Sequence, residues 1–216
     1  MNQLLIATNN QGKVKELQDL LKGTEIELIT PAHIDLDLDV IEDGHTYAEN
    51  ATKKALAFAQ ASGLISLADD SGLEVDALDG APGLYSARYG SDLAPSPSRL
   101  GGMGKAGRGR LSDKDRRDYL IQNLKGKPRP WNARFHATIA IAIPNGEIHL
   151  TEGFCEGEII PEERGTGGFG YDPIFLLKES GKTMAELSMD EKNRLSHRAK
   201  AVMKAKPVLL QIFKSK

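Results

Sequence analysis

The sequence has little cysteine, little tryptophan and no long apolar run. Its one cysteine, Cys155, can form no disulfide within the chain, and nothing resembles a cluster of thiolate metal ligands. No apolar run approaches the roughly 18 residues that span a bilayer, and the start of the chain turns polar after one short apolar stretch. We therefore expect neither a membrane anchor nor a signal peptide, and we expect a reducing cytoplasm as the compartment.

Charge of either sign is nearly balanced overall but unevenly placed. The 216 residues carry 28 basic and 30 acidic side chains, and 40% of them are hydrophobic. This composition excludes wholesale disorder and predicts a single globular domain over residues 1–216. Residues 35–49 contain six acids and no Lys or Arg, whereas residues 99–117 contain seven bases and two acids.

Hydrophobic periodicity predicts strands that alternate with helices, followed by a hairpin. This order is typical of an α/β fold with a mixed sheet flanked by helices. Pro144-Asn145-Gly146 is the hairpin turn, Ser196 is placed to cap the closing helix, and Pro207 should kink or restart that helix. The predicted strands cover 4–7, 26–29, 64–68, 134–143 and 147–154, and the predicted helices begin at Gly12, Thr46 (ending at Gly63), Asp113 (ending at Leu124) and Ser196.

Two adjacent aspartates, Asp69 and Asp70, follow the strand predicted over 64–68. Ligands of open α/β sheets bind beyond the carboxyl ends of strands, and a carboxylate there could hold Mg²⁺ and deprotonate water. Neighbouring residues of an extended chain point in opposite directions, so we expect one aspartate to face the site and the other to support it. The alternative is a solvated turn before Gly72.

The segment Thr8-Asn9-Asn10-Gln11-Gly12-Lys13 joins the first strand to the first helix. Backbone amides at a helix N-terminus with a nearby Lys form a phosphate cradle, although the same spacing fits an ordinary turn. Glu42, just before the helix that carries Lys53 and Lys54, could complete a Mg²⁺ site with the aspartates.

A glycine-rich loop occupies residues 165–170. Its glycines satisfy G-x-G-x-x-G, but the residues that follow are strand-like, whereas a dinucleotide fingerprint must open a helix. We therefore exclude a Rossmann site and expect the glycines to let backbone approach a ligand closely. Phe169 could stack on a planar base, and His197 and Arg198 could donate hydrogen bonds.

The basic stretch that includes Arg108, Arg110, Arg116 and Arg117 raises the alternative of a nucleic-acid-binding module. It has no interleaved aromatic residues, and the protein is net acidic. A solvated surface therefore explains it better than nucleic-acid binding.

Five blocks in order resemble the inosine triphosphate pyrophosphatase family: ATNNQGKVKEL (7–17), ENATKKA (49–55), ADDSGLEVDALDGAPGLYSARYG (68–90), GTGGFGYDPIF (165–175) and KNRLSHR (192–198). The resemblance implies an elongated mixed sheet, a homodimer and Mg²⁺-dependent cleavage of dITP, ITP and XTP to the monophosphate and pyrophosphate. Such an enzyme removes deaminated purines from the nucleotide pool. A pyrophosphatase for other modified nucleotides is the alternative within enzymes.

The resemblance also implies roles for individual residues. Asp70 would be the general base and, with Glu42, a Mg²⁺ ligand, and Ser71 would contact the substrate. Residues 94–110 are longer than the connection usual in the family, which predicts a flexible surface insertion. The substrate-binding set would be Thr8, Asn9, Asn10, Gln11, Gly12 and Lys13 for the phosphates, Lys54 (with Lys53 as the open alternative) for a phosphate, and Phe169, Gly170, Tyr171, Asp172, Lys192, His197 and Arg198 for the base.

Overall fold

A single six-stranded mixed sheet organises the structure, a computed structural model that describes residues 2–91 and 111–214. The strand order is β2-β1-β3-β4-β5-β6, in which β1 pairs in parallel with β2 and β3 and all later pairs are antiparallel. The predicted mixed α/β class is thereby confirmed. The strands are β1 (Asn2–Ile6), β2 (Ile26–Ile29), β3 (Ile65–Val75), β4 (Trp131–Ala142), β5 (Ile148–Ile159) and β6 (Phe175–Leu176).

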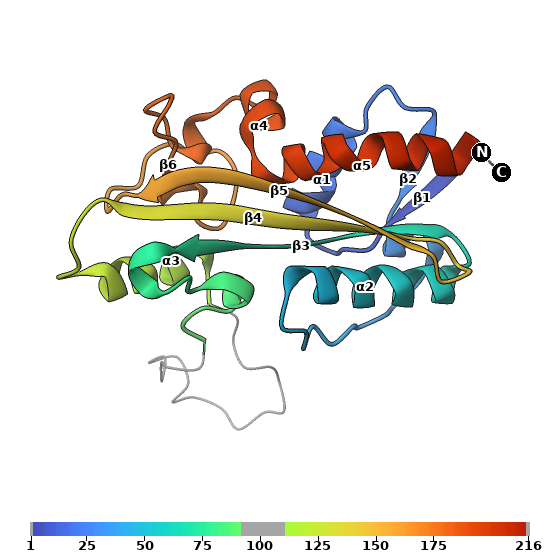
Figure 1. Cartoon of the computed structure of the whole chain (residues 1–216), viewed down its shortest axis with the longest axis horizontal. Coiled ribbons are helices and arrows are strands. Elements are labelled where there is room, and N and C mark those ends of the chain that lie inside the picture. The colour runs from blue at the N-terminus through green and yellow to red at the C-terminus, as the bar shows by residue number, and fades with distance from the viewer. Residues whose placement is uncertain (1, 92–110, 215–216) are drawn as a thin grey trace.

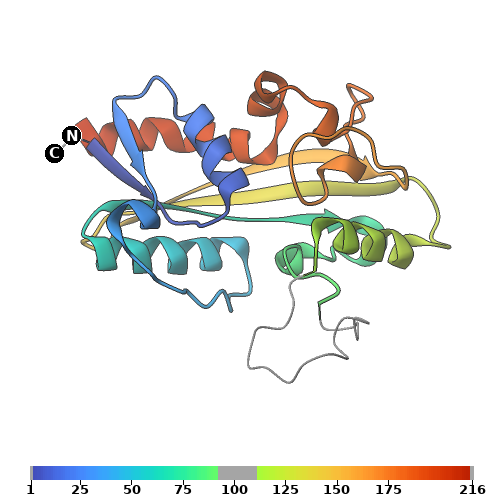
Figure 2. The ribbon, with the colours of Figure 1, turned by 180° about the vertical axis from the view of Figure 1, so that it is seen from behind.

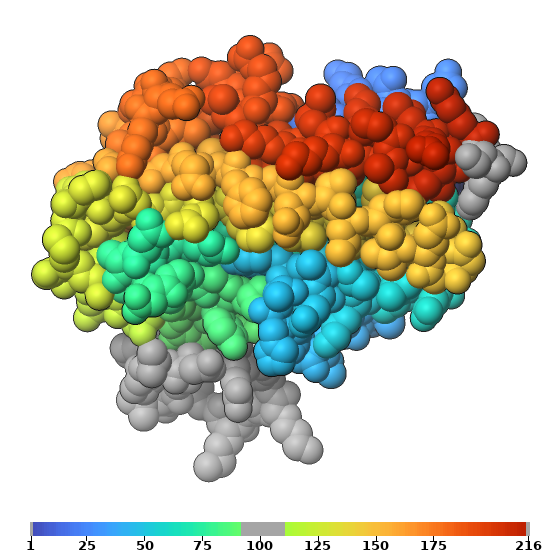
Figure 3. All heavy atoms as spheres, in the orientation of Figure 1, coloured from blue at the N-terminus to red at the C-terminus, as the bar shows by residue number. Residues whose placement is uncertain are grey.

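Helices cover both faces of the sheet. The long α5 (His197–Lys214) and α1 (Gln11–Leu20) lie on one face, and α2 (Tyr47–Ser62) lies on the other (Figures 1 and 2). The strands β3, β4 and β5 extend beyond α2 toward α3 (Asp113–Leu124) and α4 (Met189–Leu195), which gives the molecule its elongated shape (Figure 1). Figure 3 shows β5 as a surface band between α5 and α2.

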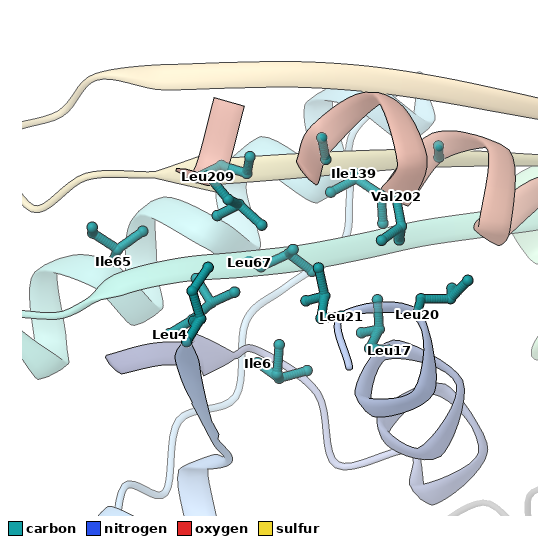
Figure 4. Close-up of a cluster of buried hydrophobic side chains, with 14 of the residues drawn as sticks. Leu4, Ile6, Leu17, Leu20, Leu21, Ile65, Leu67, Ile139, Val202 and Leu209 are labelled. Carbon is teal, nitrogen blue, oxygen red and sulfur yellow. The ribbon is translucent and has the colours of Figure 1, made fainter. Parts of the chain in front are cut away.

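The alternation of side chains along the central strands explains this layering. On β3, Leu67 packs with Leu17 of α1 and Val202 of α5 (Figure 4), whereas its neighbour Ala68 packs with Ala51 and Ala55 of α2. Because successive residues of a strand face opposite sides, this pattern fixes the side taken by every later residue of β3.

The predicted end of β3 is wrong. We expected the strand to stop at Asp69, but it continues through Asp70, Ser71 and Gly72 to Val75, paired with β4 throughout. The reason is that the two carboxylates are not solvated: Asp69 is 2% exposed and Asp70 is 9% exposed. Asp69 pairs with charged groups of α1 and α5, and Lys13 and Lys54 act on the charge of Asp70. The aspartates therefore lie in the middle of a strand and not beyond its end.

Other boundaries confirm or correct the sequence patterns. The helix predicted over 113–124 is α3, Gly63 ends α2 with a φ of 72°, and the Ser196 hydroxyl accepts from the amide of Ala199 at the start of α5. Residues 171–175, expected to be strand-like, form instead a short 3₁₀ turn (Asp172–Ile174) before β6.

Pro207 lies inside α5 without restarting it. The carbonyl that loses its hydrogen-bond partner belongs to Met203, a residue that is 57% exposed, so water can replace the missing amide.

Within residues 2–91 and 111–214, no helix is both long and apolar enough to cross a membrane. The predicted insertion at 94–110 lies outside the described residues.

Candidate active site

Adjacent residues of β3 divide the site between the two faces of the sheet. Asp69 faces the side of α1 and α5, where its carboxylate pairs with the Arg198 guanidinium and lies 3.7 Å from Lys13 Nζ. Asp70 faces the side of α2, where Glu42 and Lys54 act on its charge. The expectation of opposite roles for the two aspartates therefore fits their positions.

A buried chain of alternating charges lies on the α5 side of β3. The Glu16 carboxylate accepts from Lys192 Nζ at 2.6 Å and pairs with Arg198, while Lys192 also donates to Asp172 Oδ2 at 2.8 Å. Arg198 additionally donates to the Ser71 hydroxyl at 3.0 Å. Three acids (Asp69, Glu16, Asp172) thus alternate with three bases (Lys13, Arg198, Lys192), and the chain of charges is neutral overall.

The surroundings of these groups shift their pKa values in different directions. Burial opposes ionisation of Asp69, but the positive charges of Arg198 and Lys13 outweigh it and hold the pKa of Asp69 below its ordinary value. Burial lowers the pKa of Lys13 despite the nearby Asp69. Burial and the charge of Arg198 lower the pKa of His197 well below its ordinary value, so its imidazole is neutral at pH 7.

Asp70 has the opposite environment. Burial raises the pKa of its carboxyl group, and the nearby Glu42 carboxylate adds to this effect, against the charges of Lys13 and Lys54. One oxygen, Oδ1, accepts from the Ser71 amide at 3.1 Å, whereas the buried Oδ2 has no hydrogen-bond partner among the residues that the structure describes. A buried carboxylate with an unpartnered oxygen and a raised pKa has the properties that a general base needs.

The two lysines of α2 resolve an alternative that the sequence left open. Lys54 lines the cleft and pairs with Glu42, and its side chain is 13% exposed. Lys53 Nζ pairs instead with Asp43 Oδ1 at 2.5 Å, and 47% of the Lys53 side chain is exposed. Of the two, only Lys54 is placed to meet a ligand in the cleft.

The loop before α1 forms one wall of the cleft. Asn10 caps the helix, with its side-chain oxygen accepting from the Lys13 amide at 3.2 Å, and Lys13 Nζ donates to the Asp69 carbonyl at 3.2 Å. Gly12 lies against the Phe169 ring, where a Cβ would be only 2.7 Å from the ring carbon Cδ1. Glycine is therefore required there for the close approach of the two walls.

An aromatic and cationic surface forms the opposite end of the cleft. Lys192 Nζ and the Arg198 guanidinium lie 5.3 and 5.8 Å from the centroid of the Phe169 ring. The His197 ring stacks on Phe135, and its buried Nδ1 has no hydrogen-bond partner within residues 2–91 and 111–214. The tight turn at Gly168, where φ is 72°, lets Asp172 Oδ2 accept from the Phe169 amide at 3.1 Å. These contacts fix Phe169 as a planar wall.

The structure brings nearly all predicted site residues into one cleft of about 400 Å³. The exceptions are Asn9 and Gln11, which line an adjoining hollow of about 600 Å³ that shares Thr8, Gly12 and Lys54 with the cleft. Glu16 is a central residue that the sequence did not reveal, because an acid within a lysine-rich helix is usually solvated. The other wall, also not singled out, includes Leu84, Ser86, Arg88, Asp113, Arg116 and Phe135.

The arginines of the basic stretch do not form an open basic surface where they are described. Arg116 is 6% exposed and pairs with Asp113, and Arg117 is engaged by Glu163 and by the Gly170 carbonyl. Arg108 and Arg110, which the nucleic-acid alternative also used, lie outside the described residues.

The cleft has the donor set that suits Mg²⁺. Asp70 offers an unpartnered oxygen and Glu42 a second carboxylate, both lining the same cleft. The described residues contain no group of three or more His, Cys, Asp or Glu that could enclose a metal ion. Mg²⁺ commonly binds through one or two carboxylates and completes its shell with water and substrate phosphates, so these two residues fit that ion.

The fold and the cleft together define a class of α/β protein in which a mixed sheet carries a cleft with cationic and aromatic walls. The chain matches the model of the Ham1 family over residues 4–208, and it belongs to that family. It is 47% identical over 212 residues to the dITP/XTP pyrophosphatase of Desulforamulus reducens, a match that covers 98% of this chain and 97% of the relative. It is 41% identical over 210 residues to the dITP/XTP pyrophosphatase of Bacillus subtilis, covering 97% and 98% of the two chains.

Solved structures of Ham1 proteins have the same fold as this chain. The HAM1 protein from Coxiella burnetii superposes with a TM-score of 0.81 at 36% identity, covering 98% of this chain and all of the other. The Ham1 protein of Staphylococcus aureus gives a TM-score of 0.76 at 34% identity over the whole of both chains. The family membership and the elongated mixed sheet that the sequence blocks predicted are thereby confirmed.

Proposed function

We propose that this protein is a Mg²⁺-dependent nucleoside triphosphate pyrophosphatase that hydrolyses dITP, ITP and XTP to the monophosphate and pyrophosphate. The names of the relatives support a dITP/XTP pyrophosphatase. The observation that carries the proposal is the position of Asp70, a residue with an unpartnered carboxylate oxygen that lines the cleft together with Lys13 and Lys54.

Asp70 acts as the general base on water. The water oxygen attacks the α-phosphorus, its proton passes to Asp70, the bond from the α-phosphorus to the bridging oxygen breaks, and pyrophosphate leaves with that oxygen. Without a bound metal, burial raises the pKa of Asp70, which favours its acceptance of a proton from water.

Positive charge at the same end of the cleft stabilises the leaving group. Lys13 and Lys54 line this end, and the N-terminus of α1 presents backbone amides to it. When bound by Asp70 and Glu42, Mg²⁺ supplies further neutralisation of phosphate charge. The pairing of Lys54 with Glu42 keeps both side chains in the cleft before substrate arrives.

The other end of the cleft selects the base. The Phe169 ring can stack on a purine, and Lys192 Nζ and the Arg198 guanidinium lie 5.3 and 5.8 Å from the centroid of that ring. Cationic donors favour the carbonyl at purine position 6 of hypoxanthine and xanthine, whereas the amino group of adenine leaves them unpaired. Such a mismatch can reduce kcat/KM by roughly 10⁴-fold. Guanine shares this carbonyl, so the exclusion of dGTP depends on contacts around purine position 2.

The test is pyrophosphate release with Mg²⁺ from dITP, XTP, ITP, dATP, dGTP, dCTP and dTTP. We expect release confined to the first three, and a fall in kcat of about 10²–10⁴ in Asp70→Asn, the range that a general base supplies. Asp79→Asn is the matched control, because Asp79 is exposed and its φ of 52° suits asparagine equally. Release from other modified nucleotides alone would favour the alternative substrate class, and release from none would refute the enzymatic proposal.

We also propose, from the resemblance, that the protein is a cytoplasmic homodimer whose chain works as one domain. Light scattering coupled to size-exclusion chromatography tests the dimer. A molar mass near twice 23.5 kDa is expected, and a single-chain mass would contradict it.

A further inference from the structure

The first turns of α3 hold one residue of the glycine-rich loop from both sides. Asp113 Oδ2 accepts from the Gly170 amide at 2.7 Å, and Arg117 Nη1 donates to the Gly170 carbonyl at 2.8 Å. Gly170 has a φ of 61°, in the left-handed region, so its two polar groups are presented by a turn that glycine favours. Neither contact could be inferred from sequence, since the partners are 57 and 53 residues apart.

Both α3 residues are themselves anchored. Arg117 makes two parallel hydrogen bonds with the Glu163 carboxylate, each of 2.9 Å, and its side chain is 11% exposed. Asp113 pairs through its other oxygen with Arg116, which is 6% exposed and also lines the cleft. Bidentate and charge-assisted contacts of this kind restrict orientation as well as supply energy. Asp113 and Arg117, which contact Gly170, are therefore themselves held in place by ion pairs.

The residue next to Gly170 is Phe169, the planar wall of the cleft. The loop's own Asp172 holds Phe169, by accepting from its amide at 3.1 Å and donating to its carbonyl at 3.2 Å. Together with the two α3 contacts, every backbone polar group of Phe169 and Gly170 has a partner. Loss of the α3 pair would leave the Phe169 ring attached only through the loop's internal turn.

We propose that Asp113 and Arg117 are positioning residues that clamp the glycine-rich loop and so set the affinity for the purine base. This inference rests on the proposed function, and it adds two residues outside the loop to the determinants of base binding. The clamp contacts Gly170 and not the end of the cleft formed by Lys13, Lys54 and Asp70. It therefore acts on the base end and leaves phosphate binding and the hydrolytic step unchanged.

The experiment separates the two ends of the cleft. Asp113→Ala and Arg117→Ala are compared with wild type for the KM and kcat of dITP, and for the inhibition constant of inorganic tripolyphosphate, which has no base. We expect KM to rise about tenfold, equivalent to about 1.4 kcal/mol, with kcat and the inhibition constant within about twofold of wild type. Asp113→Asn keeps an oxygen that can accept from the Gly170 amide and should restore most of the affinity. Asp118→Ala is the control, because Asp118 is an exposed residue of α3 that pairs only with Lys114 in the described contacts.

Each contrary result overturns the clamp. An unchanged KM in both alanine variants would show that Gly170 needs no support from α3. A parallel rise of KM and of the tripolyphosphate constant would show that α3 supports the cleft as a whole. Asp113→Asn as impaired as Asp113→Ala would show that the acceptor oxygen is not what matters. Absence of pyrophosphate release from the wild type would instead refute the proposed function, and the role in base binding with it.

Discussion

The buried Glu16 offers the sharpest test of the charge network. Glu16 is 5% exposed, and its two oxygens neutralise Lys192 and Arg198. Glu16→Gln keeps the size of the side chain but leaves one uncompensated positive charge inside the protein. Removing one member of a buried ion pair costs about 3–5 kcal/mol. Since Lys192 retains Asp172 and Arg198 retains Asp69, we expect the lower end of this range.

A loss of about 3 kcal/mol corresponds to a fall in Tm of roughly 6–12 °C for a chain of this size. Thermal unfolding followed by circular dichroism measures it, with Glu25→Gln as the control, because Glu25 is exposed and has no charge partner among the described contacts. The KM for dITP should rise in the same variant, since Lys192 and Arg198 would no longer be held beneath Phe169. A Tm within 2 °C of wild type would refute the view that the network stabilises the fold.

Three further outcomes follow from the same geometry. Asp70→Asn should lower kcat by the roughly 10²–10⁴-fold expected for loss of a general base. It should also raise Tm at pH 7 by about 2–4 °C per kcal/mol gained, because burial disfavours the ionised carboxylate; a lower Tm would contradict this. Lys54→Met should reduce kcat/KM for dITP at least tenfold, the effect of about 1.4 kcal/mol, whereas Lys53→Met should leave it unchanged, and equal losses would be inconsistent with the structure. The pKa values of Asp69 and Glu16 are below their ordinary values, so their contribution to the free energy of unfolding is complete above about pH 4.5 and is lost as the pH falls through the folded pKa values. The pKa of His197 is also lowered, so the unfolded chain gains a proton first, and a series of Tm measurements from pH 7 to pH 3 should decline gently below about pH 6.5 and steeply at its acid end; a flat profile down to pH 3 would contradict this.

The parts of the fold that the sequence predicts are those that local physics determines. Asp113–Leu124 could be delimited because its cap, Ser112, and its helical pattern lie within the segment itself. The Pro144-Asn145-Gly146 turn likewise needs only its own residues, and Gly146 takes a φ of 98°. Where a segment supplies its own capping and turn chemistry, sequence and structure agree.

The errors occur where distant partners override local preference. Asp69-Asp70-Ser71-Gly72 has the composition of a turn, yet it lies inside β3 because Arg198 and Lys13, distant in sequence, neutralise Asp69. Glu16 was missed for the same reason, since its partners lie in α4 and α5. The blocks that carry the family resemblance contained all these residues, but a block does not show which acid is buried or what it contacts.

The two adjacent aspartates show how a single register gives one protein two carboxylates of different chemistry. On the α5 side, Asp69 is compensated by Arg198 and Lys13, its pKa is lowered, and it stays charged and unreactive. On the α2 side, Asp70 is buried beside another carboxylate, its pKa is raised, and one of its oxygens is free. A slip of β3 by one residue against α1 and α2 would exchange the two environments. The pairing of Asp69 with Ile139 and of Asp70 with Thr138, which fixes that register, therefore also determines which aspartate has the raised pKa and the unpartnered oxygen.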